Sequence, residues 1–267
     1  MNNDIVYILK NDLDDEELIY SIRSVCANFE FGSIWFAGGH SENIIPDHHI
    51  HVNQKGQNKW YKVRNTLEII CNNKEISNDF WLFNDDFFIM KPLTSSLPPL
   101  IDGTILKRIK ELNKKYPLKN SGYVQQLSIT KLCLHTQEFD TLNYALHVPM
   151  LINKKKALET LKLFPNCPMF RSLYGNHHKI GGTIINDVKI YDLDQKPTGE
   201  EYLLSTTNES FHNGRHTQIY CEKVVTRLNA VLTKNKNKSF KDIQNALCDE
   251  LASIKIDLFT GIITVND

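Results

Sequence analysis

The sequence predicts an α/β protein in which helices cover a mainly parallel sheet. The first hundred residues alternate short apolar runs with segments of helical periodicity, which is the pattern of that fold class. With 267 residues, 41% of them hydrophobic and 10% aromatic, the chain is large and apolar enough to bury a core. Twelve glycines and nine prolines are too few for a collagen-like or low-complexity chain. We therefore expect one main domain with an appendage.

The elements of the first hundred residues follow one another closely. Residues 5–9 form a β-rich run. Apolar residues then recur at three- and four-residue spacing over 18–29, and acidic residues at 14–17 suit the N-terminus of that helix. The further elements expected here are strands at 34–37 and 49–52, a helix at 63–71, and strands at 80–83 and 87–90.

The rest of the chain is expected to be richer in helices. Three prolines indicate a surface loop at residues 92–102. The elements expected after it are helices at 105–115, 124–134 and 154–164, extended segments at 145–152 and 202–205, short β-like runs within 175–199, and amphipathic helices at 219–232 and 240–254. We divide the chain into a main domain at 1–215 and a helical extension at 216–267 that packs on it or forms an oligomer.

Charge, targeting signals and cysteines narrow the function classes. Thirty-one basic and 31 acidic residues cancel, so no overall field attracts nucleic acid or an anionic membrane. No apolar run approaches the roughly 18 residues that span a bilayer, and the N-terminus lacks a basic signal region, which predicts a cytoplasmic protein. The six cysteines lack zinc-site spacing, and most are expected to be reduced thiols.

Two adjacent carboxylates, Asp85 and Asp86, directly follow an apolar strand. Open α/β sheets bind ligands at the carboxyl ends of their strands. Carboxylates are also the ligands of Mg²⁺ or Mn²⁺ when such an ion holds a diphosphate and neutralises its developing charge. The alternative is that both residues cap a turn, as aspartate commonly does. The motif favours the metal site.

His147 is the histidine best placed for chemistry. It interrupts an apolar run, so its imidazole is either hydrogen-bonded in the core or directed into a site, where imidazole suits a general base. The histidine clusters at 48–51 and 177–178 match no zinc-site spacing. The chain also lacks the dinucleotide fingerprint, the Walker A loop, the His-Glu-x-x-His motif and the serine-hydrolase elbow. What remains is a carboxylate and histidine site on an α/β sheet.

The order of several short blocks resembles the Stealth family. That family contains nucleotide-sugar-dependent transferases, among them bacterial capsule hexose-1-phosphate transferases and the catalytic subunit of the lysosomal-targeting N-acetylglucosamine-1-phosphotransferase. The most specific match is Glu17-Leu18-Ile19-Tyr20-Ser21-Ile22-Arg23-Ser24, which is similar to a Glu-Leu-Arg-Tyr-Ser-Leu-Arg-Ser block. The other matching blocks are 4–7, 65–68, 80–88, 147–149, 170–172 and 207–209. The resemblance spans about residues 4–210 and is dense only in the first 90.

The resemblance implies a Rossmann-like sheet of the GT-A type and a metal-dependent transferase. The donor would be a nucleotide-sugar, here a UDP-sugar, and a sugar or sugar-1-phosphate would pass to a hydroxyl of a glycan or polyol-phosphate. The implied contacts to uridine and phosphate are Tyr7, Asn11, Arg23 and Asn65. Mg²⁺ or Mn²⁺ would be held by Asp86 with Asp85 or Glu209. The implied catalytic residues are Asp85, His147 near the acceptor hydroxyl, and Arg171 on phosphate.

Three departures from the family pattern leave the chemistry open. Asn11 stands where the family has an aspartate, Ile19 replaces an arginine, and Glu209 replaces an aspartate. The sequence therefore fixes neither the sugar, nor the nucleotide, nor whether phosphate is transferred. One alternative is a glycosyltransferase of the same fold acting on hydroxymethylated DNA bases, with a basic groove at 107–115 or 154–156. Another is a sugar- or nucleotide-binding module that has lost turnover.

Overall fold

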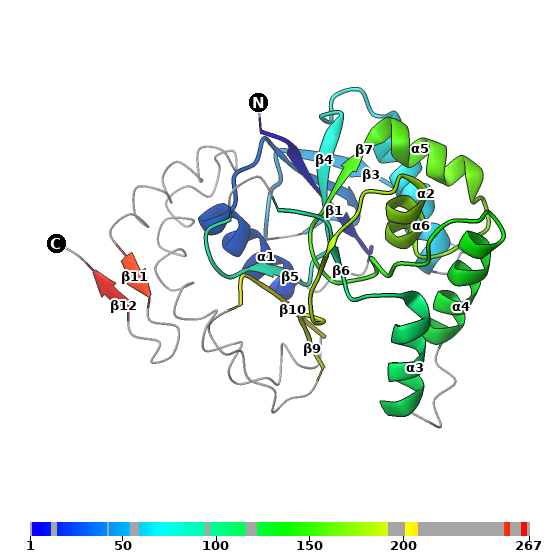
Figure 1. Cartoon of the computed structure of the whole chain (residues 1–267). Helices are drawn as coiled ribbons and strands as arrows, with labels where there is room; N and C mark the ends of the chain where they lie inside the picture. The colour runs from blue at the N-terminus through cyan, green and yellow to red at the C-terminus, as the bar shows by residue number, and fades with distance from the viewer. Residues whose placement is uncertain are drawn as a thin grey trace.

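The computed structural model confirms an α/β protein built on a mainly parallel sheet (Figure 1). It describes residues 2–11, 15–41, 43–53, 59–93, 97–115, 122–191 and 201–207, and the strands at 254–256 and 263–265. The central sheet has the order β3-β2-β1-β4-β7. Its strands are β1 (Asp4–Leu9), β2 (Ile34–Gly38), β3 (His48–His51), β4 (Asp79–Phe83) and β7 (Met150–Asn153). Only β7 pairs antiparallel, with β4.

The order of the strands reverses beside β1. The chain runs outward from β1 through β2 to β3, and then returns to place β4 on the other side of β1. Open α/β sheets bind ligands in a crevice at the carboxyl ends of the strands, beside such a reversal of strand order. Lys10 follows β1 and Asn84 follows β4, so both lie at that crevice.

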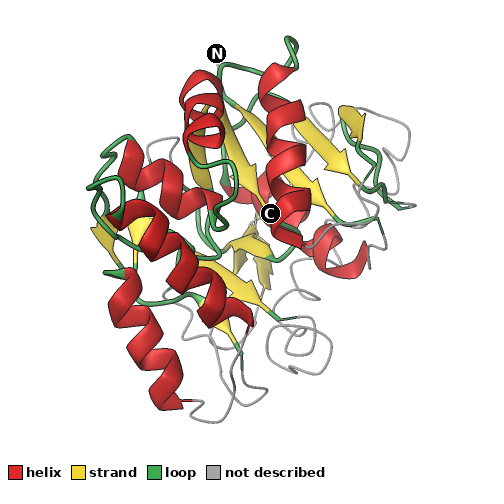
Figure 2. Cartoon of the chain, turned by 90° about the vertical axis from the view of Figure 1, so that its right-hand side faces the viewer, coloured by secondary structure: helices red, strands yellow, loops and turns green. Residues whose placement is uncertain are grey.

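Helices cover both faces of the sheet (Figures 1 and 2). Because successive residues of a strand point to opposite faces, Tyr7 packs in the core under α1 and Val6 in the core on the other face. The helix on the Tyr7 face is α1 (Asp15–Asn28). The helices on the Val6 face are α2 (Lys59–Asn72), α5 (Lys154–Leu163) and α6 (Phe170–His177).

A small second sheet continues from the central one at the carboxyl end of β4. Its strands are β5 (Phe87–Ile89), β10 (Leu203–Thr206) and β9 (Lys189–Ile190), in the order β5-β10-β9. The register aligns Ser205 with Phe87 on one side and with Lys189 on the other. Three residues far apart in the sequence therefore form one row across this sheet.

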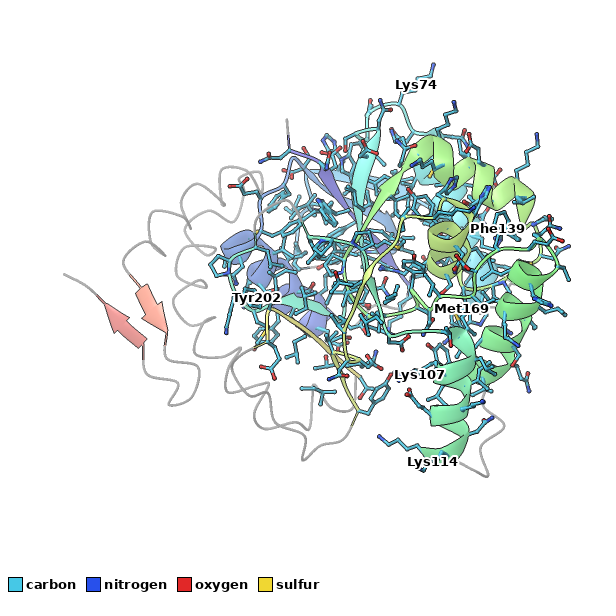
Figure 3. The ribbon with its side chains drawn as sticks, viewed as in Figure 1. Lys74, Lys107, Lys114, Phe139, Met169 and Tyr202 are labelled. Carbon is cyan, nitrogen blue, oxygen red and sulfur yellow. A yellow bond between two sulfur atoms is a disulfide. The ribbon has the colours of Figure 1, made fainter. Side chains whose placement is uncertain are left out.

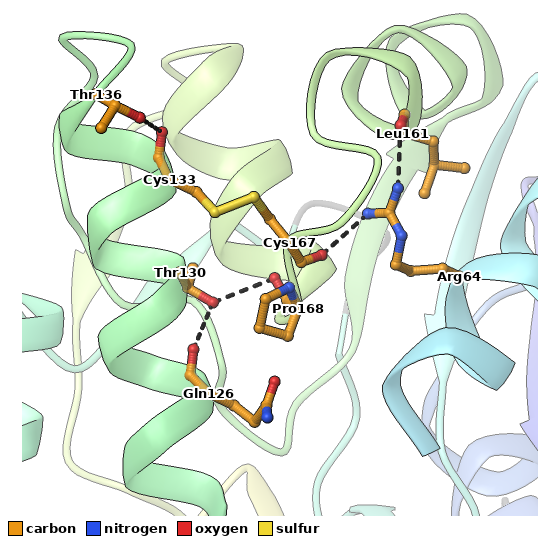
Figure 4. Close-up of a disulfide and its surroundings, with 8 residues drawn as sticks. All are labelled: Arg64, Gln126, Thr130, Cys133, Thr136, Leu161, Cys167 and Pro168. Atoms are coloured by element: carbon orange, nitrogen blue, oxygen red, sulfur yellow. Dashed lines mark hydrogen bonds between the residues drawn. A yellow bond between two sulfur atoms is a disulfide. The ribbon is translucent and has the colours of Figure 1, made fainter. Parts of the chain in front are cut away.

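Two further helices and a disulfide border α6. The helices are α3 (Ile105–Lys115) and α4 (Gly122–His135). A disulfide joins Cys133 of α4 to Cys167 in the loop before α6, and the carbonyl of Cys167 accepts a hydrogen bond from Arg64 of α2 (Figure 4). The remaining strands are β6 (Leu100–Ile101) paired with β8 (Thr183–Ile184), and β11 (Ile254–Ile256) paired with β12 (Ile263–Val265).

Most of the expected elements are confirmed, and three segments differ from expectation. α6 was not expected, because its sequence is short and contains Gly175, which is required there since a Cβ atom would lie 2.5 Å from the Tyr144 ring. Most of the segment at 145–152 is loop before β7, and the loop at 92–102 contains β6. Cys26 and Cys71 are buried thiols outside any disulfide, Cys133 and Cys167 are paired, and Cys221 and Cys248 lie outside the described residues.

Part of the expected C-terminal organisation lies outside the described residues. This holds for the helix at 219–232 and for most of the helix at 240–254, whose last residue instead begins β11. None of the helices that the structure describes is long and apolar enough to cross a membrane.

Candidate functional site

The turn between β4 and β5 carries the two aspartates predicted from the sequence. The Phe87 amide donates to the Asn84 carbonyl at 3.4 Å, so Asp85 and Asp86 are the central residues of a turn. This turn lies at the carboxyl end of β4, beside the end of β1, where the strand order reverses. The position is the one at which open α/β sheets bind ligands.

One oxygen of Asp86 accepts three hydrogen bonds. His147 Nδ1 lies 2.7 Å and Lys189 Nζ 2.6 Å from Asp86 Oδ2, and Ser205 Oγ donates to the same atom at 3.2 Å. The Asp86 side chain is only 12% exposed, so these donors replace water around the carboxylate. The other oxygen, Oδ1, is buried and has no hydrogen-bond partner.

The register of the small sheet explains how two of these donors reach Asp86. Ser205 and Lys189 are aligned neighbours on β10 and β9, and Ser205 is also aligned with Phe87, the residue after Asp86. Aligned residues of neighbouring strands point to the same face. The row therefore brings a hydroxyl and an ammonium to the carboxylate that precedes Phe87.

The two aspartates differ in their electrostatics. Burial alone would raise the pKa of Asp86, but the hydrogen bond and charge of His147 and the charge of Lys189 outweigh it and hold that pKa well below its usual range. Burial and the charge of Asp86 raise the pKa of Asp85 to about 6, against the opposing charges of Lys10 and Lys189. Asp86 is therefore a fixed anion, whereas Asp85 takes up a proton more readily.

A third carboxylate, Glu17 in the first turn of α1, belongs to the same group. It is 7% exposed, and its Oε1 accepts a hydrogen bond from Thr206 Oγ at 2.6 Å. Burial raises its pKa to about 7; the Thr206 hydrogen bond opposes this, and the charges of Asp86 and Asp85 add to it. Glu17 is thus half-ionised near neutrality.

His147 and Asp86 form a base and its orienting carboxylate. An ionised Asp86 cannot donate, so the contact at 2.7 Å requires that Nδ1 of His147 carries the hydrogen. The imidazole then holds its free lone pair on Nε2. The ring is 34% exposed and packs edge-on against Phe87, with the ring centroids 5.9 Å apart. This pairing of imidazole and carboxylate is the arrangement of a general base.

His147 lines a cavity of about 180 Å³ on the α2 side of the turn. Asn84 and Arg171 also line it, and most of the remaining wall is apolar or aromatic, with Trp60 and Tyr123 among its residues. A concave, mainly apolar pocket with a few polar groups at one end is typical of a small-molecule site.

Arg171 braces the site through backbone contacts. Its two terminal nitrogens donate to the carbonyls of Val148 and Leu82, and its guanidinium lies 5.1 Å from the centroid of the Phe87 ring. Burial lowers its pKa to about 10, at which it stays charged at neutral pH. Arg171 thereby links the loop that carries His147 to the end of strand β4.

The residues expected to contact the donor nucleotide are not gathered around Asp86. Tyr7 is fully buried, and its hydroxyl pairs with Ser21 Oγ at 3.0 Å, so the core encloses it. Arg23 lies on α1 with its guanidinium 5.9 Å from the Tyr20 ring, and Asn65 lies exposed on α2. Only Asn11, exposed just after β1, lies at the crevice.

The expected metal ligands do not form a closed set. No three His, Cys, Asp or Glu side chains within the described ranges converge on a common point, and Glu209 lies outside those ranges. Oδ2 of Asp86 already accepts three hydrogen bonds, and a divalent ion bound there would have to displace the Lys189 ammonium. Asp86 Oδ1, which has no hydrogen-bond partner, and the neighbouring Asp85 are the oxygens left for a metal ion.

Three residues of the candidate site were not identified from the sequence. Lys189 and Ser205 lie in short strands, and only the register brings them to Asp86. Glu17 was interpreted as an ordinary acidic residue at a helix N-terminus. Its position inside the most specific block of the resemblance was a signal that could have singled it out.

No protein-family model matches the sequence, and a search of curated proteins finds no match.

Proposed function

We propose that this chain is a GT-A-type transferase that takes a sugar or a sugar-1-phosphate from a nucleotide-sugar and passes it to a hydroxyl acceptor. The observation that carries the proposal is the pair formed by His147 and Asp86, of which His147 lines a cavity at the carboxyl edge of a mainly parallel sheet. The resemblance of the blocks at 4–7, 17–24 and 80–88 to the Stealth family supports the same reaction class.

His147 acts on the acceptor in this proposal. Its Nε2 takes the hydroxyl proton while the acceptor oxygen attacks the donor, and Asp86 stabilises the imidazolium that forms. In glycosyl transfer, the bond from C1 to the phosphate oxygen breaks and its electron pair leaves with a nucleoside diphosphate. In sugar-phosphate transfer, the bridging P–O bond of the diphosphate breaks, and a nucleoside monophosphate leaves.

Donor turnover tests this proposal directly. Purified protein is incubated with a panel of nucleotide-sugars and candidate acceptors, and the released nucleotides are separated by chromatography. Release of UDP indicates glycosyl transfer, and release of UMP indicates sugar-phosphate transfer. We expect His147→Gln to lower turnover about 10²- to 10⁴-fold, the usual contribution of a general base. The matched control is His135→Gln, at the exposed end of α4, which should keep full turnover.

The acceptor panel also decides between the remaining alternatives. α3 carries exposed lysines, among them Lys107 and Lys114 (Figure 3), and hydroxymethylated DNA belongs in the panel for that reason. Transfer to DNA would weaken steeply with added salt. Nucleotide-sugar binding without turnover on any acceptor would contradict the enzyme and identify a binding module.

A further inference from the structure

Lys189 places a positive charge at the point where a divalent cation would bind Asp86. Its Nζ lies 2.6 Å from Asp86 Oδ2. Its side chain is 11% exposed, so the ammonium has given up most of its water. An ammonium is buried in this way only where strong partners replace its hydration.

A hydrogen bond of its amide and its pairing with β10 fix the backbone position of Lys189. The Lys189 amide donates to Asp187 Oδ1 at 3.1 Å, and the residue is aligned with Ser205 of β10. Ser205 contacts the same carboxylate oxygen, at 3.2 Å. The ammonium is therefore part of a fixed row and not the end of a freely moving surface lysine.

Other positive charges lie around the same turn. Lys10 follows β1 at the crevice, and its charge acts on Asp85. Lys59 opens α2, and the charge of Lys189 acts on it in turn. The crevice can accordingly receive an anion.

We propose that Lys189 takes the place of the divalent cation: its ammonium binds the diphosphate of the nucleotide donor, and donor binding needs no metal. This rests on the proposed function for the identity of the donor. Lysine binds phosphate as a point charge, and a fixed cation in a site of restricted water stabilises the charge that develops on a leaving phosphate. Asp86 orients the ammonium as well as the imidazole.

Binding of UDP, measured by calorimetry in excess EDTA, tests this without requiring an acceptor. We expect wild-type protein to bind UDP equally well in EDTA and in Mn²⁺. Lys189→Ala should bind about 10- to 100-fold more weakly in EDTA, the usual loss for a hydrogen bond to a charged group. Lys189→Arg, which keeps the positive charge, should retain most of the binding. The matched control is Lys114→Ala, on the exposed end of α3, which should bind as wild type does.

Rescue by a metal separates a ligand-binding role from a structural one. Removing the ammonium frees Asp86 Oδ2 beside Asp85, so Mn²⁺ should restore UDP binding to Lys189→Ala while leaving wild type unchanged. A lysine that merely joined the small sheet to the turn would give no such rescue. Thermal melts of each variant verify that it is folded. The comparison of wild-type protein in EDTA and in Mn²⁺ does not depend on the folding of any variant.

The outcomes for this inference and for the proposed function differ. Wild-type binding that requires Mn²⁺, equal binding by Lys189→Ala in EDTA, or no UDP binding under any condition would each overturn the role of Lys189. Metal-free binding through Lys189 with no donor turnover would support this role and overturn the transferase. Turnover that needs Mn²⁺ and is retained in Lys189→Ala would support the transferase and overturn the role of Lys189.

Discussion

Two buried carboxylates contact opposite faces of β10, and together they show how the charge of a partner sets the pKa of a buried carboxyl group. Asp86 contacts Ser205 and Glu17 contacts the next residue, Thr206, and the two are 8% and 7% exposed. Asp86 is also paired with an ammonium and an imidazole, and its pKa lies well below its usual range. Glu17 has a neutral hydroxyl partner, and its pKa is raised to about 7. Similar burial thus gives a permanent anion at one position and a titrating group at the other.

The comparison predicts that removing the Asp86 carboxylate is the most damaging single change. Asp86→Ala leaves the Lys189 ammonium buried without its anion, and breaking a buried pair in this way costs about 3–5 kcal/mol. Urea unfolding at pH 7 measures the loss. The double variant Asp86→Ala with Lys189→Met should lose clearly less than the sum of the two single changes, because no orphaned charge is left. Additive losses would show that the pair does not stabilise the fold.

Neutralising Glu17 should stabilise the fold, whereas removing the Asp86 carboxylate destabilises it. Its pKa is raised in the folded protein, so the folded state binds more protons than the unfolded state between about pH 4.5 and 7, and stability falls as pH rises through this window. Glu17→Gln keeps an acceptor for Thr206 and removes this dependence. We expect it to stabilise the fold by about 1 kcal/mol at pH 5 and about 3 kcal/mol at pH 8.

Urea unfolding of Glu17→Gln and wild type at the two pH values measures this difference. The control is Glu111→Gln on α3, whose carboxylate is half-exposed and which should change stability little at either pH. A Glu17→Gln effect that is equal at pH 5 and pH 8 would contradict a titrating Glu17.

The residues around these carboxylates also show which parts of the site could be predicted from the sequence. Asp85, Asp86 and His147 were identified because each stands out locally, as a polar residue next to or within an apolar run. The parallel core was predicted for the same reason, since its strands and helices show their own periodicity. These are properties of neighbouring residues in the chain.

What the sequence did not show depends on long-range pairing. Lys189 lies 103 residues from Asp86, Thr206 lies 189 residues from Glu17, and Cys133 and Cys167 are 34 residues apart on different elements. The strands that bring Lys189 and Thr206 into place are short, and strand β9 has only two residues. Their register is fixed by tertiary packing, so no local sequence pattern predicts it.

The smallest expected effects come from the two neighbouring hydroxyls of β10. Thr206→Val removes the hydrogen bond that Thr206 Oγ1 donates to Glu17 Oε1 at 2.6 Å, and at pH 8, where Glu17 is ionised, the loss should be about 2 kcal/mol. Ser205→Ala removes the longest of three bonds to Asp86, so Lys189 and His147 still hold the carboxylate and the loss should stay near 0.5–1 kcal/mol. Urea unfolding of both variants at pH 8 ranks them. A larger loss of stability for Ser205→Ala than for Thr206→Val would contradict this expectation. The Ser205 hydroxyl, and not the charges of Lys189 and His147, would then position Asp86, and the two carboxylates would not differ in the way proposed.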